Sequence, residues 1–193
     1  MTTLSVEAIG LCAHYGEDGE RAFQLAFSLA KKRRRRLNIF QFLNDPYEPT
    51  ADDHADVTGT ERQRRLVEME RTLRLHYDAR LEDYVDVGFR ICEDSAWKEL
   101  QRCLLLRREF QTLVLVCPSE GARFGDGPLL QRVDQFGCPT IVVGPGSRPH
   151  RCNAPARLIL DQLFDQDIVS GLQEIGDHVP QNESRRPHAE SVL

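Results

Sequence analysis

The stretch from Thr112 to Gly146 constrains the fold more than any other part of the sequence. It begins with an unbroken apolar run at 113–117 and ends with a second apolar run at 140–143. A polar, glycine-bearing loop and a segment with helical apolar spacing lie between the two runs. Strands that are apolar on both faces are typical of parallel sheets, because helices cover both sides of such sheets. The stretch therefore predicts a strand–loop–helix–strand unit of an α/β protein.

Strand and helix patterns alternate through the rest of residues 1–147. The predicted strands cover 4–13, 37–43 and 85–91, and the predicted helices cover 20–32, 61–82 and a segment that starts near residue 95. The strand at 85–91 alternates strictly between apolar and polar residues, so we expect it to be half exposed. This order predicts an α/β fold with a doubly wound, five-stranded parallel sheet of the Rossmann-like type.

The composition changes after residue 147, which predicts an extension over residues 148–193. Residues 148–151 form a predicted linker, residues 156–175 a predicted amphipathic helix, and the polar end of the chain a predicted disordered tail. A short strand at 158–160 before the helix stays open as an alternative. The helix either packs on its own domain or docks on a protein partner or a second copy. We favour docking, because the domain looks complete without the helix. The docking residues would be Leu160, Phe164, Ile168 and Leu172.

The composition also restricts the class of protein. The chain has 193 residues, of which 40% are hydrophobic and 28% charged, so one domain with a substantial core is expected. The net charge of -5 gives no overall attraction to nucleic acid. No apolar run approaches the roughly 20 residues of a membrane helix, and the first residues do not resemble a signal peptide. Six scattered cysteines without a C-x-x-C pair indicate reduced thiols, so we predict a soluble, cytoplasmic protein without a structural metal.

Ligands of doubly wound sheets bind where the carboxyl ends of the strands meet, near the topological switch point. This rule places the predicted ligand site near residues 13–16, 42–45 and 117–127. His14 and Phe42 lie in two of these segments. Cys117 and Ser119 lie in the third, but no motif pairs either of them with a base, which argues against nucleophilic catalysis.

Two local signatures resemble the universal stress protein family. Residues 137–143, Gly-Cys-Pro-Thr-Ile-Val-Val, resemble the Cys-Pro-hydrophobic last strand of that family. The first strand, with its acidic turn at Gly16-Glu17 and helix start at Arg21-Ala22, looks like the family's opening segment. The resemblance covers about residues 4–144. It implies a five-stranded α/β fold, a homodimer formed through the last strand, and a place in either an ATP-binding or a non-binding group.

The ATP-binding group carries Gly-x2-Gly-x9-Gly-Ser/Thr after the fourth strand, where backbone amides and a hydroxyl hold the phosphates. In this sequence Gly121 and Gly125 are one residue too far apart, and the loop is too short for the nine-residue spacer. Asp126-Gly127-Pro128 replaces Gly-Ser/Thr, and a carboxylate there would repel a phosphate. His14 stands where the family has an aspartate. ATP is the one cofactor that the resemblance suggests, and these departures argue against its binding in the family manner. The residues that would line the site are His14, Phe42, Gly121, Gly125, Asp126 and Gly127.

The strongest charge feature is a run of six basic residues, which we call the basic run. Cations at a helix carboxyl end complement the helix dipole by about 0.3–1 kcal/mol each, but one or two residues would serve that purpose. The run is therefore either a solvated or intramolecularly paired cluster, which we favour, or a docking patch for phosphate, nucleic acid, anionic lipid or an acidic partner. No aromatic residues are interleaved with it, which makes nucleic acid unlikely as the partner. The run consists of Lys31, Lys32, Arg33, Arg34, Arg35 and Arg36.

The loop with Asp52, Asp53, His54 and Asp56 has no recognisable metal-ligand spacing, so we interpret it as an acidic loop. Taken together, the sequence predicts a non-enzymatic regulatory or interaction protein that resembles universal stress proteins and forms a dimer. The alternative is a nucleotide-binding switch or weak ATPase that uses a rearranged loop at 121–127.

Overall fold

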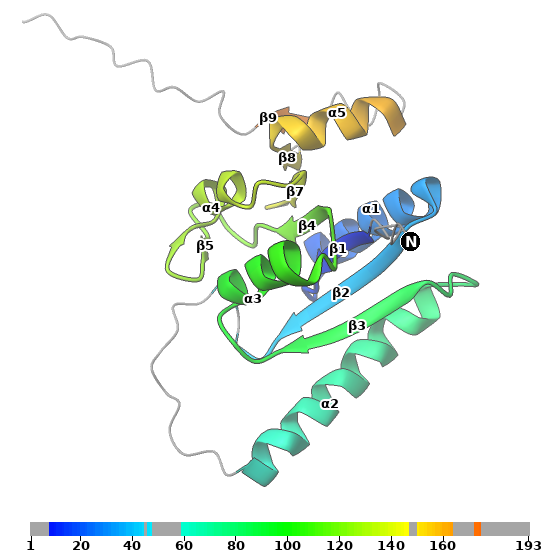
Figure 1. The fold of residues 1–193 in the computed structure, drawn as a ribbon, viewed down its shortest axis with the longest axis vertical. Helices are drawn as coiled ribbons and strands as arrows, with labels where there is room; N and C mark the ends of the chain where they lie inside the picture. The colour runs from blue at the N-terminus through cyan, green and yellow to red at the C-terminus, as the bar shows by residue number, and fades with distance from the viewer. Residues whose placement is uncertain (1–7, 45, 48–58, 147–149, 164–171, 175–193) are drawn as a thin grey trace, which may run out of the picture.

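The computed structural model describes residues 8–44, 46–47, 59–146, 150–163 and 172–174. Helices cover both faces of one central sheet (Figure 1). A 3₁₀ turn at Asp78–Arg80 and a π-helical turn at Cys103–Arg107 are labelled η1 and η2. In chain order the elements are β1 (Ala8–Cys12), α1 (Glu17–Arg33), β2 (Arg36–Phe42), α2 (Gly59–Tyr77), η1 (Asp78–Arg80), β3 (Val87–Cys92), α3 (Ala96–Arg102), η2 (Cys103–Arg107), β4 (Thr112–Val116), β5 (Arg123–Phe124), β6 (Gly127–Pro128), α4 (Leu129–Gln135), β7 (Thr140–Val143), β8 (His150–Cys152), α5 (Ala154–Leu163) and β9 (Leu172–Glu174).

The sheet has the strand order β3-β2-β1-β4-β7-β8-β9. Its first five strands are all parallel, which confirms the predicted doubly wound parallel sheet. Because β1 has β2 on one side and β4 on the other, the topological switch point lies between β1 and β4. The sheet has more strands than the five expected, since β8 pairs antiparallel with β7 and β9 pairs with β8.

Alternate residues of the central strands belong to two separate hydrophobic cores, one on each face of the sheet. Ile9, Leu11 and Val114 face α1, where they pack with Phe23 and other apolar residues of that helix. Leu113 faces the other side and belongs to the cluster that includes residues of α3 and α4. Fully burying a side chain of this size contributes about 1.5–3 kcal/mol relative to leaving it exposed. The unbroken apolar run of β4 is explained by this burial on both faces.

The edge strand β3 is half exposed, as its alternating sequence predicts. Helix α2 packs against β3 and buries only Leu73 and Tyr77 along its whole length. The helix ends at Tyr77 and continues as η1, so it is shorter than the predicted 61–82 segment. The sheet is therefore thinly covered at this edge.

The extension beyond residue 147 differs from the prediction. Residues 150–152 form β8, although the segment looks like a linker because it is polar and follows a proline. The predicted single helix at 156–175 is wrong, since α5 ends at Leu163 and residues 172–174 form β9. Leu160 is fully buried in the core beside Ala156 and Cys152, so the interpretation of Leu160 as a docking residue is also wrong. The apolar spacing of α5 serves the protein's own core.

The remaining predictions for the extension have different outcomes. Leu172 lies in β9, not in a helix. Phe164, Ile168 and the predicted disordered tail lie outside the described residues. The last strand of the parallel set, β7, has β4 on one side and β8 on the other. A homodimer through β7 therefore requires β8 to leave that edge.

The buried side chain of Asn153 ties this extension to the amino end of β7. Its Oδ1 accepts hydrogen bonds from the Thr140 amide at 3.0 Å and from the Ala156 amide at 3.1 Å. Its Nδ2 donates to the Cys138 carbonyl at 2.8 Å. The bond to Ala156 caps the first turn of α5. One side chain thus holds the start of α5 and the start of β7 together.

Candidate functional site

The carboxyl edge of the sheet, where the sequence predicts a ligand, is filled by the loop that follows β4. Residues 123–128 of this loop form the β5–β6 hairpin, and the side chain of Phe124 is fully buried. The Phe124 ring lies edge-on to Tyr47, with ring centroids 5.7 Å apart. The Gly125 amide donates a hydrogen bond to the Pro46 carbonyl at 3.0 Å. The loop is therefore packed onto the protein and does not stand open as a phosphate cradle.

The glycines of this loop serve the hairpin. Gly125 has φ +62°, and a Cβ added there would lie 3.4 Å from Trp97 Cβ. A Cβ at Gly127 would lie 2.6 Å from Arg132 Nε. Gly121 also has positive φ, but an added Cβ would meet nothing within 4 Å. The turn and the close approach of Arg132 thus explain Gly125 and Gly127 without a ligand.

Asp126 places a carboxylate at the rim of the same loop. Its carboxylate pairs with Arg132, and its carbonyl accepts a hydrogen bond from Arg123. The Arg132 guanidinium also lies over the Trp97 ring, 4.6 Å from the ring centroid. These contacts fix the hairpin to α4. They also keep a negative charge at the position where the resembled family has a hydrogen-bond donor to a phosphate.

The amino terminus of α1, at the same edge, is acidic. Glu17, Asp18 and Glu20 occupy its first turn. The Asp18 carboxylate accepts a hydrogen bond from the Gly146 amide at 3.1 Å, and Arg21 donates to the Gly146 carbonyl. A helix amino terminus attracts anions, and here the protein's own carboxylates already provide the negative charge.

The other predicted residues at this edge have structural roles. Phe42 is buried in the core, so packing accounts for this residue and its side chain offers no surface to a ligand. The His14 ring lies edge-on to Tyr47, with centroids 5.7 Å apart. Cys117 donates its S–H to the Ser119 carbonyl at 3.1 Å, and burial raises the pKa of the Cys117 thiol. A thiol held in its neutral form is a poor nucleophile, so the geometry gives Cys117 no catalytic role.

The opposite edge of the sheet contains a cavity of about 290 Å³ that lies outside the predicted ligand site. It lies on the α3 side of β2 and β3, near the amino ends of these strands. Its lining comes from β2 (Arg36 and Asn38), β3 (Gly88 and Arg90) and η2 (Arg107), together with Glu109 and three further residues. Four of the lining residues are arginines and one is a glutamate. The cavity is therefore rich in guanidinium groups.

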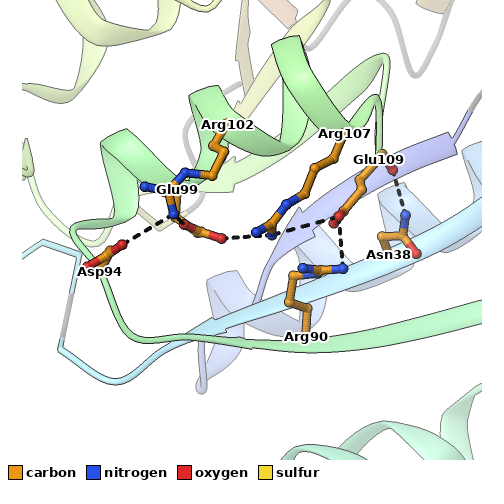
Figure 2. A network of polar contacts seen from close by, with 7 residues as sticks. All are labelled: Asn38, Arg90, Asp94, Glu99, Arg102, Arg107 and Glu109. Carbon is orange, nitrogen blue, oxygen red and sulfur yellow. Dashed lines mark hydrogen bonds and ion pairs between the residues drawn. The ribbon is translucent and has the colours of Figure 1, made fainter.

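A chain of ion pairs holds the guanidinium groups at the wall of the cavity (Figure 2). Arg90 Nη2 lies 2.8 Å from Glu109 Oε1, and Arg107 Nη1 lies 3.0 Å from Glu99 Oε1. The Glu99 and Glu109 side chains are only 8% and 16% exposed. Asn38 Nδ2 donates to the Glu109 carbonyl at 2.5 Å, which joins β2 to the segment before β4. Two mostly buried carboxylates thus orient two arginines.

The basic run spans the end of α1 and the start of β2. Lys31 pairs with Glu82 at 3.0 Å, and Arg34 is the left-handed cap of α1 with φ +52°. Arg36 pairs with Asp86 at 3.6 Å and belongs to the cavity. The predicted intramolecular pairing therefore holds for Lys31 and Arg36. Because Arg36 begins β2, the run leads directly to the rim of the cavity.

Two further findings concern metals and membranes. Within the described residues, no group of three or more His, Cys, Asp and Glu side chains is placed to hold a metal ion. The acidic loop with Asp52, Asp53, His54 and Asp56 lies outside the described residues. None of the described helices has the length and apolar character needed to cross a bilayer.

Sequence comparison gives only partial matches. No family model matches the chain. A segment of 70 residues, 36% of this chain, is 37% identical to the RNA polymerase subunit beta' of Hydrogenovibrio crunogenus. A segment of 75 residues, 39% of this chain, is 33% identical to the corresponding subunit of Angiopteris evecta. These matches span 5% and 10% of the two subunits.

Comparison with solved structures gives matches along most of the chain. The hypothetical protein PH0823 matches 72% of this chain and 94% of its own, with a TM-score of 0.50 and 13% identity. A universal stress family protein from Burkholderia pseudomallei matches 74% of this chain and 98% of its own, with a TM-score of 0.48 and 13% identity. The universal stress protein UspA of Lactobacillus plantarum matches 72% of this chain and 98% of its own, with a TM-score of 0.48 and 14% identity. With a TM-score of 0.50 and 13% identity to PH0823, what the chain shares with the solved structures is the doubly wound α/β fold.

Proposed function

We propose that this chain is a non-enzymatic regulatory or interaction protein that does not bind ATP in the manner of universal stress proteins. The observation that carries the proposal is the closed loop after β4. Phe124 fills the space under this loop, and its hairpin is pinned through Asp126 to Arg132. A nucleotide phosphate would have to displace a fully buried aromatic side chain and approach a carboxylate.

The charge of the carboxyl edge supports the same proposal. Glu17 and Asp18 lie at the amino terminus of α1, and Asp126 lies at the rim of the loop. Like charges disfavour a phosphate, and the field is strongest where the side chains are partly withdrawn from water. Asp18 is such a side chain, since it is 18% exposed.

The basic run is the surface that we assign to a protein partner of acidic character. Arg34 is exposed at the end of α1, and its backbone is fixed by hydrogen bonds to the carbonyls of Ala30 and Lys31. Since β8 covers β7, this surface, not the β7 edge, is the proposed meeting point with that acidic partner. All six cysteines are buried free thiols, which supports a reducing compartment such as the cytoplasm.

Calorimetric titration and native mass spectrometry with Mg-ATP test the proposal. We expect no bound nucleotide on the purified protein and no heat of binding for Mg-ATP. The control is the Phe124→Ala variant, in which the space under the loop is vacated and a latent nucleotide site would become accessible. One nucleotide per wild-type chain that shifts the backbone amides of Gly125 and Gly127 would place it at the loop after β4, contradict the proposal and favour the nucleotide-binding switch.

A further inference from the structure

We propose that the cavity at the amino ends of β2 and β3 is a binding site for a small organic phosphate. The proposal goes beyond the proposed function, because it concerns the edge of the sheet opposite the closed loop. It rests on the shape of the cavity, the arrangement of its donors and its charge.

The floor of the cavity depends on Gly88. In the sheet register Asn38 lies opposite Gly88, and Arg36 precedes it on the same face of β2. A Cβ at Gly88 would lie 2.4 Å from Asn38 Oδ1 and 2.9 Å from Arg36 Nη2. Because Gly88 has no side chain, the side chains of Asn38 and Arg36 can lie against the backbone of β3 at this position. Arg36 Nε also donates to Asn38 Oδ1 at 3.0 Å, which orients the guanidinium over this floor.

The wall of the cavity is shaped by the end of η2. After Arg107 the backbone of Arg108 takes the left-handed conformation with φ +51° and turns the chain toward β4. This turn brings Arg107, Arg108 and Glu109 together above the two strands. Because the helix ends here, no described helix covers the polar half of the β2–β3 face, whereas Phe40 and Phe42 further along β2 are buried.

The donors of the cavity are incompletely used. A guanidinium carries five N–H donors in a planar fork. Among the described contacts, Arg90 uses Nη2 for Glu109, and Arg36 uses Nε and Nη1. Within the described residues, no hydrogen bond or ion pair engages the Arg108 guanidinium. Several N–H groups around one cavity thus remain for a ligand.

The charge balance specifies an anion. Four guanidinium groups and the single carboxylate of Glu109 line the cavity. Glu99 and Asp86 pair with Arg107 and Arg36 from outside the lining, so four cations face three carboxylates and one positive charge remains in excess. Arg36 and Arg90 are held in place by partners before any ligand arrives, so binding costs little side-chain entropy. Planar guanidinium forks match the oxygen geometry of a phosphate, which they bind in bidentate pairs. The volume of about 290 Å³ is at the lower end of ligand pockets, which suits a small phosphorylated molecule better than a full dinucleotide.

Titration with pyrophosphate, followed by calorimetry and by the backbone amide shift of Gly88, tests the proposal. Pyrophosphate probes the phosphate contacts and AMP the organic part of the ligand, so AMP should bind wild-type protein more tightly than inorganic phosphate, the reference for a bare anion. AMP binding no tighter than inorganic phosphate would reduce the cavity to a bare anion site and overturn the proposal. We expect pyrophosphate to bind wild-type protein and to shift the Gly88 amide. Arg36→Gln and Arg108→Gln should each weaken binding about tenfold, the loss expected for one charged hydrogen-bond partner. The melting temperature should stay close to that of the wild type, because neither side chain is buried.

The matched control is Arg33→Gln, which removes one charge from the same basic run without touching the cavity. It should change the pyrophosphate affinity less than about twofold, since surface charges are largely screened at physiological salt. Equal weakening by Arg33→Gln and Arg36→Gln would show a general attraction to the basic surface and overturn the site. Absence of binding would overturn it as well. If the Gly125 and Gly127 amides shift on titration and still do so in Arg36→Gln, the anion binds at the loop after β4. That result would overturn the cavity site and contradict the proposed function as well.

Discussion

The two edges of the parallel sheet differ in both packing and charge. At the carboxyl edge, Phe124 and its hairpin occupy the space after β4, and Asp18 and Asp126 supply negative charge. At the amino edge, a cavity of about 290 Å³ is lined by guanidinium groups. Doubly wound sheets hold ligands at the carboxyl edge as a rule. In this chain the conditions for anion binding lie at the other edge, so the fold alone does not locate the site.

The difference arises from the two segments that flank β4 in the chain. The segment after β4 contains an aromatic residue, Phe124, that folds back onto Tyr47 and the core. The segment before β4 contains Arg107, Arg108 and Glu109, whose charged groups cannot be packed into an apolar core without partners. One segment therefore fills its edge with a ring, and the other leaves a polar cavity.

The largest expected effect is at the filled edge. Phe124→Ala should lower the free energy of unfolding by about 3–5 kcal/mol, because a fully buried ring is replaced by a cavity. Chemical denaturation measures the change. The control is Leu105→Ala, since Leu105 is 66% exposed and its truncation should cost less than about 0.5 kcal/mol. A loss under about 1 kcal/mol for Phe124→Ala would mean that the loop is not packed down, and the contrast between the two edges would fail.

A second prediction concerns the part of the amino edge that is closed. Asn153→Ala should destabilise the protein by about 2–3 kcal/mol, because it leaves the buried Thr140 amide without the Asn153 acceptor and uncaps α5, while the Cys138 carbonyl keeps only the hydrogen bond from Thr140 Oγ1. Thermal and chemical denaturation measure it. Asn153→Asp keeps the acceptor for both amides but replaces the donor to Cys138 by a carboxylate oxygen that faces the Cys138 carbonyl at a buried position, so it should also destabilise the protein. An unchanged stability of Asn153→Ala would show that the extension is not fastened to β7.

A third prediction concerns the open part of the amino edge. Gly88→Ala should cost about 1–3 kcal/mol, since the new Cβ meets Asn38 Oδ1, which the bond from Asn38 Nδ2 to Glu109 holds in place. The same change should reduce pyrophosphate binding, because it raises the floor of the cavity. Gly59→Ala is the control, since an added Cβ meets nothing within 4 Å there. Gly88→Ala with wild-type stability and wild-type binding would remove the structural basis of the cavity.

Much of the fold could be predicted from the sequence, because its signals are local. The apolar run of β4 and the alternation within β3 each depend on a few adjacent residues, and both predictions are confirmed. The extension could not be predicted in the same way. Leu160 and Ala156 have the spacing of a helical face, and that spacing does not say whether the face covers its own core or a partner. The strand at 150–152 is too short and polar to show a strand pattern.

The cavity could not be predicted, because its residues come from separate parts of the chain. Arg36, Gly88 and Arg107 meet only through the register of β2 with β3 and the turn after η2. One signal was available in advance. The strict alternation at 85–91 places Gly88 and Arg90 on the face opposite Val87 and Phe89, so a polar half of this edge could have been expected.

The smallest expected effect returns to the filled edge. Asp126→Ser removes the carboxylate and restores a hydroxyl of the kind that the resembled family uses near a phosphate. We expect no measurable Mg-ATP affinity in calorimetry, because Phe124 still fills the space and the loop keeps its hairpin. Because the Asp126 side chain is 83% exposed and Arg132 keeps its contact with the Trp97 ring, the lost ion pair should cost about 1 kcal/mol of stability and leave the fold unaffected. Micromolar ATP binding after this single change would mean that charge, not packing, closes the edge, and the difference between the two edges would then be electrostatic alone.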